Sequence, residues 1–282
     1  MTVSVLMSVY KSERADFFDR ALNSVWTTQS KKPDQIILIQ DGPLGEDLLD
    51  VIKKWQTMLG DVFCFHTNEH NLGLTKSLNI GLDMVRCDLI ARMDTDDIAM
   101  PDRFRRQHDF LASHPDVDIV GGAMEMVDEN ENLKYVRYYP ETFSEIVKKL
   151  PKQSPFAHPA VMMRASAFKE RGLRYDERYR NSQDIVLWFD ALSLGCGMAN
   201  LHDVVLKFTE AGDVYERRGT VRAKNEFLGW MRGIKKNYGL FTFKYVYPCA
   251  RYLVRSLPTG IIKLYYNSKL YRRSYANHSK VI

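Results

Sequence analysis

Hydrophobic side chains in the first hundred residues change repeatedly between two spacings. Val3–Val9 is a run of apolar and β-branched residues typical of a strand, and Asp16–Thr27 carries apolar residues at helical spacing. The same pair follows at Gln35–Gln40, an almost continuous apolar run, and at Glu46–Leu59. Strands that are apolar on both faces and alternate with helices predict a parallel sheet covered by helices on both sides.

Two further strands extend this pattern, and the second of them ends at acidic residues. Val62–His66 precedes a predicted helix at Leu74–Val85, and Leu89–Met93 is a short strand. Asp41 follows the second strand of the chain, and the acidic cluster Asp94–Asp97 follows the fourth. In sheets of this kind ligands bind beyond the carboxyl ends of the strands, so both acidic positions are expected at the ligand-binding edge.

The second half of the chain has a less regular pattern. Pro101–Ser113 predicts a helix with proline in its first turn. Asp118–Val127 and Lys134–Tyr139, separated by Asp-Glu-Asn-Glu-Asn, predict a hairpin. Mixed strands after a parallel half indicate one α/β unit with a second, extended part. The remaining predictions are a strand at Ala160–Arg164, a helix at Ile185–Leu194 and a strand at Val204–Thr209.

Charge divides the chain into a body and a tail. The 282 residues are 45% hydrophobic and have a formal net charge of +5. Residues 214–282 hold 15 Lys and Arg against two acidic residues (net +13), whereas residues 1–213 hold 25 against 33 (net −8). The basic segment is also rich in tyrosine, so its expected partner is polyanionic, either nucleic acid or a membrane interface. We therefore predict an α/β domain at 1–213, with halves 1–100 and 101–213, and a basic helical tail at 214–282.

Cysteine usage and the lengths of the apolar runs bear on location. The four cysteines form no CxxC pair, which is typical of core thiols in a reducing compartment. No run reaches the roughly 18 apolar residues of a membrane span, and the apolar run at the start is short for a signal peptide. A cytoplasmic location is predicted.

Three carboxylates follow one another closely at Asp94, Asp96 and Asp97. Like charges at this spacing repel one another, and a cation would relieve the repulsion; hard oxygen ligands favour Mg²⁺ or Mn²⁺. The simpler interpretation is an acidic turn in contact with solvent. The position after a predicted buried strand, in line with Asp41, favours a metal site.

Three other positions have both a structural and a chemical interpretation. The turn before Leu74–Val85 could present backbone N–H groups and Lys76 to an anion, or could be an ordinary turn. Asp184 opens an apolar helix, either as its N-cap or as a general base toward a hydroxyl group. His158, before a predicted strand, is either a structural histidine or part of a site.

Six segments in this order resemble the family 2 glycosyltransferases, which have the nucleotide-sugar-binding GT-A fold. They are VSVLMSVYKSE, QIILIQDG, NLGLTKSLNIGL, ARMDTDDIAMPDRF, HPAVMMR and the Gln-Asp of NSQDIVLW, and they span about residues 2–219. The resemblance implies a mostly parallel central sheet flanked by helices, followed by the C-terminal basic helical extension. It also implies transfer of a sugar from a nucleoside diphosphate with inversion at the anomeric carbon.

The resemblance assigns a donor site and a metal site. Asp96 and Asp94 match the DxD motif that holds Mn²⁺ or Mg²⁺, and Arg217 and Arg218 match a basic segment that closes over the donor diphosphate. Lys76 stands one turn from the position of a donor-contacting arginine that this chain lacks. The donor-binding residues implied are Ser8, Val9, Tyr10, Asp41, Lys76, Asp94, Thr95, Arg217 and Arg218.

The resemblance also assigns the acceptor side. Asp184 matches the catalytic base, Gln183 stands where many relatives have Glu, and Gln183 and His158 are expected to face the acceptor. A closer likeness is to bacterial transferases that build O-antigen or exopolysaccharide repeat units on undecaprenyl diphosphate. It implies a β-1,3-galactosyl- or glucosyltransferase that uses a UDP-sugar and a lipid-linked acceptor. The basic tail would then bind the anionic inner face of the cell membrane, and not nucleic acid.

Three other functions remain open. Sugar-nucleotidyl transfer also uses a parallel sheet and clustered carboxylates, but it normally has a glycine-rich loop after the first strand, and Val9–Glu13 contains no glycine. A nucleic-acid-binding protein could use the basic, aromatic tail, which leaves the acidic positions unexplained. The third alternative is a sugar-nucleotide-binding module without catalysis.

Overall fold

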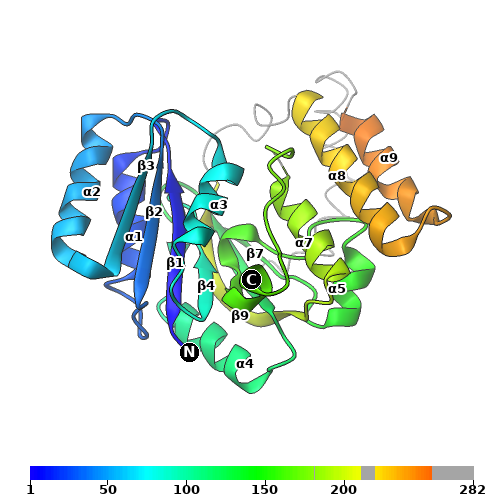
Figure 1. Ribbon diagram of the computed structural model, residues 1–282, viewed down its shortest axis with the longest axis horizontal. Helices are drawn as coiled ribbons and strands as arrows, with labels where there is room; N and C mark the ends of the chain where they lie inside the picture. Colours follow the sequence, from blue (N-terminus) through cyan, green and yellow to red (C-terminus); the bar gives the residue numbers. More distant parts are fainter. Residues whose placement is uncertain (181, 211–219, 256–282) are drawn as a thin grey trace.

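A mixed sheet forms the centre of the protein, whose computed structural model describes residues 1–180, 182–210 and 220–255 (Figure 1). The strand order is β3 (Phe63–Asn68), β2 (Gln35–Asp41), β1 (Val3–Val9), β4 (Leu89–Arg92), β8 (Met162–Arg164), β6 (Ile119–Val127), β9 (Met198–Thr209) and β5 (Ile98–Ala99), with β7 (Leu133–Arg137) paired to β6. The first four strands of this order are parallel, as predicted. β8 is antiparallel to both β4 and β6, which joins the two halves of the chain in one sheet.

Helices cover both faces of the parallel half because its central strands have apolar side chains on both sides. Along β1, Val5 packs in a core with α1 (Ala15–Val25) and α2 (Glu46–Leu59). The next residue, Leu6, packs on the opposite face with α3 (Leu74–Asp83). This alternation is the two-residue period of a strand, and it gives the helix–sheet–helix layers visible in Figure 1. The expected arrangement of a central sheet flanked by helices is confirmed. The sheet as a whole is mixed, because its parallel pairings are joined by the antiparallel pairings of β5, β7 and β8.

The second half contains the elements that the pattern indicated and several that it did not. α4 (Arg103–Ser113), α7 (Gln183–Ser193) and the hairpin of β6 and β7 match the predictions. The short strand β5 and the helices α5 (Phe143–Lys149) and α6 (Ala165–Lys169) were not predicted. A sequence signal for α5 exists, because Thr142 and Glu145 form a capping box.

Two predicted strands have different limits in the structure. His158–Ala160 forms a 3₁₀ turn, so β8 begins at Met162 rather than at Ala160. β9 begins at Met198 instead of Val204, because it continues through the polar residues His202 and Asp203, which interrupt the apolar pattern.

Two helices of the basic tail lie at one end of the molecule, where the first packs on α7 and the second packs on the first (Figure 1). They are α8 (Thr220–Tyr238) and α9 (Val246–Arg255). Trp230 is only 3% exposed, and a Cβ atom at Gly233 would come within 2.1 Å of the Phe189 ring. The glycine therefore permits close contact between α8 and α7, and one face of α8 belongs to the core of the fold.

Residues 214–219 and 256–282 of the tail lie outside the described residues, as do residues 211–213. The basic pair Arg217 and Arg218 falls in this part of the chain. Among the described residues, no helix combines the length and the apolar character needed to cross a membrane.

Candidate active site

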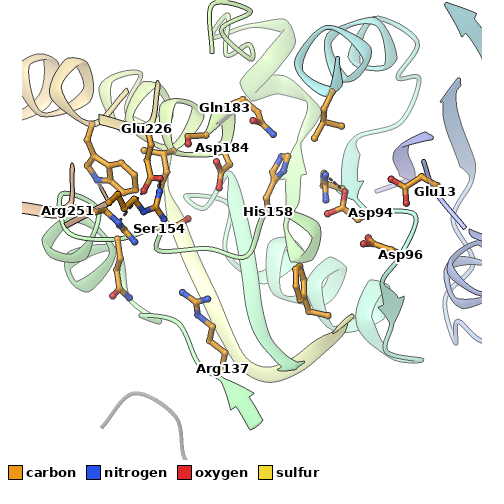
Figure 2. A pocket seen from close by; sticks show the side chains of 18 residues that line it. Glu13, Asp94, Asp96, Arg137, Ser154, His158, Gln183, Asp184, Glu226 and Arg251 are labelled. Carbon is orange, nitrogen blue, oxygen red and sulfur yellow. Dashed lines mark ion pairs between the residues drawn. The ribbon is translucent and has the colours of Figure 1, made fainter. Parts of the chain in front are cut away.

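A cleft of about 580 Å³ lies between the acidic turn that follows β4, the first turn of α7, and the helices α8 and α9 (Figure 2). Its volume is in the range of roughly 300–1,000 Å³ common for small-ligand sites. Five of the residues singled out from the sequence line it: Asp94, Asp96, His158, Gln183 and Asp184. The fold therefore brings the acidic turn and the start of α7 to one cavity, although they are far apart in the sequence.

The acidic turn concentrates negative charge at one side of this cleft. Oxygen atoms of Asp94, Asp96 and Asp97 all lie within 4.8 Å of one another. Asp97 is completely buried, and one of its oxygens accepts a hydrogen bond from the backbone N–H of Thr209 at 3.0 Å. Burial, together with the neighbouring charges of Asp96 and Asp94, raises the pKa of Asp97 well above its ordinary value.

These residues fit a divalent cation. The second carboxylate oxygen of Asp97 is buried and has no hydrogen-bond partner among the described residues. Three carboxylates close together, one of them with an unsatisfied oxygen, form the hard oxygen donor set that Mg²⁺ and Mn²⁺ prefer. Asp96 and Asp94 face the cleft and could therefore hold such an ion against a ligand.

A buried arginine supports the acidic turn from below. Arg92, the last residue of β4, is 2% exposed and forms an ion pair with Asp94. Burial opposes the charged form of Arg92, but Asp94 outweighs it and the pKa of Arg92 is raised. Arg103 donates a hydrogen bond to the Arg92 carbonyl oxygen at 2.7 Å. Burial and the nearby Arg92 lower the pKa of Arg103 to about 9. Both arginines occur in the ARMDTDDIAMPDRF segment, in which the sequence pattern indicates a role only for the acidic residues.

Asp184 lies in the first turn of α7, at another wall of the cleft. The N-cap of this helix is Ser182, which has a left-handed backbone conformation with φ of 66°. The alternative that Asp184 is the N-cap is therefore wrong. The positive end of the helix dipole stabilises a carboxylate at this place, and Asp184 faces the same cavity as Asp94 and Asp96.

His158 is both a buried structural residue and a part of the cleft wall. Its Nε2 atom is hydrogen-bonded to the hydroxyl group of Tyr175 at 2.7 Å, and its ring meets the edge of Trp188 at a centroid distance of 6.1 Å. Burial and the charge of Arg92 lower the pKa of His158 well below its ordinary value, so the ring is neutral. Burial raises the pKa of Tyr175, and the charges of Asp184 and Asp94 add to this shift. The Tyr175 hydroxyl therefore remains protonated and can share a hydrogen bond with His158.

Asp41 is placed differently from the acidic turn. It is 4% exposed, and each of its carboxylate oxygens accepts two hydrogen bonds from the turn that precedes α3. The donors are the backbone N–H groups of Leu72 (2.7 Å) and Gly73 (2.9 Å) and the amide groups of Asn71 (2.9 Å) and Asn68 (3.1 Å). Gly73 has a φ of 88°, which side chains other than glycine rarely allow. Asp41 thus holds this turn in shape.

The other predicted donor residues do not line the cleft as far as the structure describes it. Val9 and Thr95 are buried, Ser8 is half-buried and Tyr10 is 41% exposed at the end of β1. Lys76 is half-exposed, and its Nζ atom lies 3.9 Å from the Glu177 carboxylate. Arg217 and Arg218 lie outside the described residues.

Several charged residues that line the cleft were not expected from the sequence. They are Glu13, Arg92, Arg137, Glu226, Arg251 and Arg255. Arg251 and Arg255 had been counted only as charges of the basic tail. Because residues four apart share one face of a helix, the sequence predicts that Arg251 and Arg255 point in the same direction. It does not predict which part of the protein that face contacts.

Comparison with known proteins agrees with this architecture. Residues 4–172 match the family described as Glycosyl transferase family 2. The amylovoran biosynthesis glycosyltransferase AmsE of Erwinia amylovora is 33% identical over 93% of this chain and 97% of its own length. A UDP-Gal:alpha-D-GlcNAc-diphosphoundecaprenol beta-1,3-galactosyltransferase of Escherichia coli is 31% identical over 96% of both chains. This chain belongs to family 2 of the glycosyltransferases, as the order of its motifs indicated.

Solved structures share the fold at low sequence identity. The crystal structure of S. aureus TarS 1–349 in complex with UDP-GlcNAc has a TM-score of 0.66 and 17% identity, covering 99% of this chain and 79% of that one. The mannosyltransferase PcManGT from Pyrobaculum calidifontis, in complex with GDP-Man and Mn²⁺, has a TM-score of 0.63 and 14% identity, covering 96% and 82%. The family membership favours glycosyl transfer over nucleotidyl transfer as the activity of the α/β domain.

Proposed function

We propose that this protein is a metal-dependent, inverting hexosyltransferase. It moves galactose or glucose from a UDP-sugar to a sugar linked through diphosphate to undecaprenol, with β-1,3 linkage, in the synthesis of a bacterial surface polysaccharide such as O-antigen. One observation carries the proposal: Asp184 lines the same cleft as Asp94 and Asp96. The printed name of the E. coli relative, with its UDP-Gal donor and diphosphoundecaprenol acceptor, supports the choice of substrates.

In this proposal the acidic turn binds the donor diphosphate. Asp96 and Asp94 would be the ligands of Mn²⁺ or Mg²⁺, and the ion, when bound, supplies positive charge that stabilises the leaving diphosphate. Arg92 orients Asp94 through their ion pair. Arg217 and Arg218 are proposed to close over the same diphosphate, by the motif that they match.

Asp184 is proposed as the general base that takes the proton from the acceptor hydroxyl. A direct displacement needs one such carboxylate and attack from the face opposite the leaving group. Gln183, the residue before Asp184, and neutral His158 also line the cleft and lie near Asp184 in Figure 2. Both are proposed to position the acceptor sugar.

The nucleoside of the donor is proposed to bind where β1 and β2 end. Ser8, Val9, Tyr10 and Thr95 belong to this edge of the sheet or to the acidic turn beside it. Both oxygens of Asp41 are engaged by the turn before α3, so its proposed contribution is to hold the surface against which the nucleoside lies. Lys76 reaches the donor when its contact with Glu177 opens.

The protein is further proposed to be cytoplasmic and bound to the inner face of the cell membrane. The connection between α8 and α9 exposes apolar side chains, with Phe241 and Phe243 at 101% and 93% exposure. Lys235, near the end of α8, and Lys244 flank these side chains in the sequence, and this mixture of apolar and basic residues suits an anionic lipid surface. Replacing both phenylalanines by serine should move the protein from the bound to the free fraction when it is sedimented with anionic vesicles; unchanged binding would remove this connection from the proposal.

The enzymatic proposal is tested by transfer from UDP-galactose and UDP-glucose to a synthetic lipid-diphosphate sugar with Mn²⁺ present. Asp184→Asn should lower the turnover number by about 10²–10⁴-fold, the usual contribution of a general base, and leave the affinity for UDP-sugar unchanged in calorimetry. Normal transfer by this variant would show that another group accepts the proton. Absence of transfer by the wild-type protein, with donor binding intact, would support the non-catalytic module instead.

A further inference from the structure

The cleft has a basic end as well as an acidic one. In Figure 2, Glu13, Asp94 and Asp96 lie on one side, and Glu226 and Arg251 lie on the other, with His158 and Asp184 between them. Arg137, Arg251 and Arg255 contribute three positive charges to the second side, against the single negative charge of Glu226. Among the lining residues that the structure describes, this end of the cavity therefore has two more positive than negative charges, whereas the acidic turn gives the opposite end a negative charge.

The arginines of α9 are held at the cavity wall by contacts within the tail helices. The Nε atom of Arg251 lies 3.2 Å from the Glu226 carboxylate, and Arg255, one helical turn further on, pairs with the same carboxylate. The Arg251 guanidinium also lies over the Trp230 ring, 5.1 Å from its centroid. Glu226 is 9% exposed and so fixes both groups in a partly dehydrated environment.

Arg137 reaches the cavity from a different element. It belongs to β7, and its guanidinium lies 5.3 Å from the Tyr139 ring centroid. Gln153 and Ser154 also line the cavity and add neutral polar groups, with Ser154 on the same side as Arg251 in Figure 2. Planar guanidinium groups that converge from two elements suit an anion with several oxygen atoms, because each can form paired hydrogen bonds with it.

We propose that Arg137, Arg251 and Arg255 bind the diphosphate group of the acceptor. The inference rests on the proposed function, since direct displacement requires the acceptor hydroxyl to approach from the side opposite the leaving diphosphate. The donor diphosphate is assigned to Asp94 and Asp96, so the remainder of the acceptor extends past Asp184 toward the arginines. In the proposed acceptor one sugar unit separates the attacking hydroxyl from the diphosphate, and the negative charge of the diphosphate is opposite in sign to the net charge of the described residues at this end.

Direct binding tests the site without any catalytic step. Geranyl diphosphate is titrated into the protein in a calorimeter with EDTA present, so that no divalent ion can bridge the probe to the acidic turn. Arg137→Gln and Arg251→Gln should each weaken binding on the order of tenfold, as expected for loss of a charge-assisted hydrogen bond to phosphate. The matched control is Arg105→Gln, because Arg105 is exposed on α4 and pairs with Asp102, away from the cleft. Equal affinity of the wild-type protein and both cleft variants would overturn the proposal.

Kinetics then identify the source of the diphosphate. The two cleft variants should raise KM about tenfold for an acceptor sugar linked through diphosphate to a lipid, but leave KM unchanged for UDP-sugar and for the same sugar on a neutral alkyl chain. An increase in KM for UDP-sugar would assign the arginines to the donor, and an equal increase for both acceptors would assign them to the sugar; either result contradicts the proposal. Arg137 belongs to β7 and not to the tail helices, so its variant remains informative if Arg251→Gln unfolds, which thermal denaturation reports. If the wild-type protein transfers to neither acceptor, the proposed function fails, while the titration still decides whether the site exists.

Discussion

The turns that follow β2 and β4, at the same edge of the sheet, differ in how their buried carboxylates are stabilised. Asp41, at the end of β2, accepts four hydrogen bonds from its own chain, two of them from backbone N–H groups. The turn after β4 instead places Asp94, Asp96 and Asp97 against one another, with Arg92 as the buried basic partner of Asp94. One oxygen of Asp97 has no hydrogen-bond partner in the part of the chain that the structure describes. The carboxylate of the first turn has its hydrogen-bond partners without a ligand, whereas the carboxylates of the second turn still offer an oxygen atom to a cation.

This difference separates residues that serve folding from residues that serve binding. An acid whose oxygens are saturated by local N–H donors stabilises the native state, because unfolding exchanges these bonds for bonds to water. Acids that repel one another in a partly buried turn reduce stability, and their arrangement is favourable only when a cation is present. The same substitution, Asp to Ala, should therefore have opposite consequences in the two turns.

The largest effect is expected for activity on removal of Asp96. Asp96→Ala should lower the rate of sugar transfer by about a thousandfold, or about 4 kcal/mol of transition-state stabilisation, because a ligand of the proposed metal is lost. The free energy of unfolding measured with urea in EDTA should stay the same or rise, since a like charge next to buried Asp97 is removed. Substantial transfer by this variant in the presence of chelator, or a clear loss of stability, would assign Asp96 to folding.

The reverse result is expected for Asp41. Asp41→Ala leaves two backbone N–H groups and two side-chain amides without their acceptor, which should reduce the free energy of unfolding by about 3 kcal/mol. Asp50→Ala is the matched control, because Asp50 is exposed and forms an ion pair with Lys53 at 3.2 Å on the surface of α2; its effect should be within about 0.5 kcal/mol. Urea unfolding of the three proteins measures both values. Equal stability of the two variants would mean that the turn before α3 does not depend on Asp41.

The positions of both turns could be predicted from the sequence, but their roles could not. Asp41 and Asp94 each follow a continuous apolar run, and such runs mark the ends of buried strands. The hydrogen-bond donors to Asp41 come from residues 27 to 32 positions later, and they reach it only because β3 pairs with β2 in a particular register. Local pattern carries no information on that pairing.

The basic end of the cleft shows the same limit more strongly. The sequence predicts a basic, helical tail, and the helices α8 and α9 agree with it. That Arg251 faces the cavity follows from the packing of α8 on α7, which depends on Gly233 against Phe189. Helical periodicity can show that two arginines share a face, whereas tertiary packing determines what that face meets.

The smallest expected effect is the change in stability when a divalent ion binds. This measurement compares variants of both turns in one experiment. A ligand that binds only the native state at about a hundred times its dissociation constant adds about 2.7 kcal/mol to the free energy of unfolding, roughly 5 °C in the unfolding temperature of a chain this long. Mn²⁺ should produce this increase in the wild-type protein and, from a lower starting value, in Asp41→Ala, because that variant keeps its acidic turn. In Asp96→Ala the increase should be absent, since the remaining acids are Asp94, which is paired with Arg92, and buried Asp97. Calorimetric scans with and without Mn²⁺ make the comparison, and an equal increase in all three proteins would locate the ion outside the acidic turn.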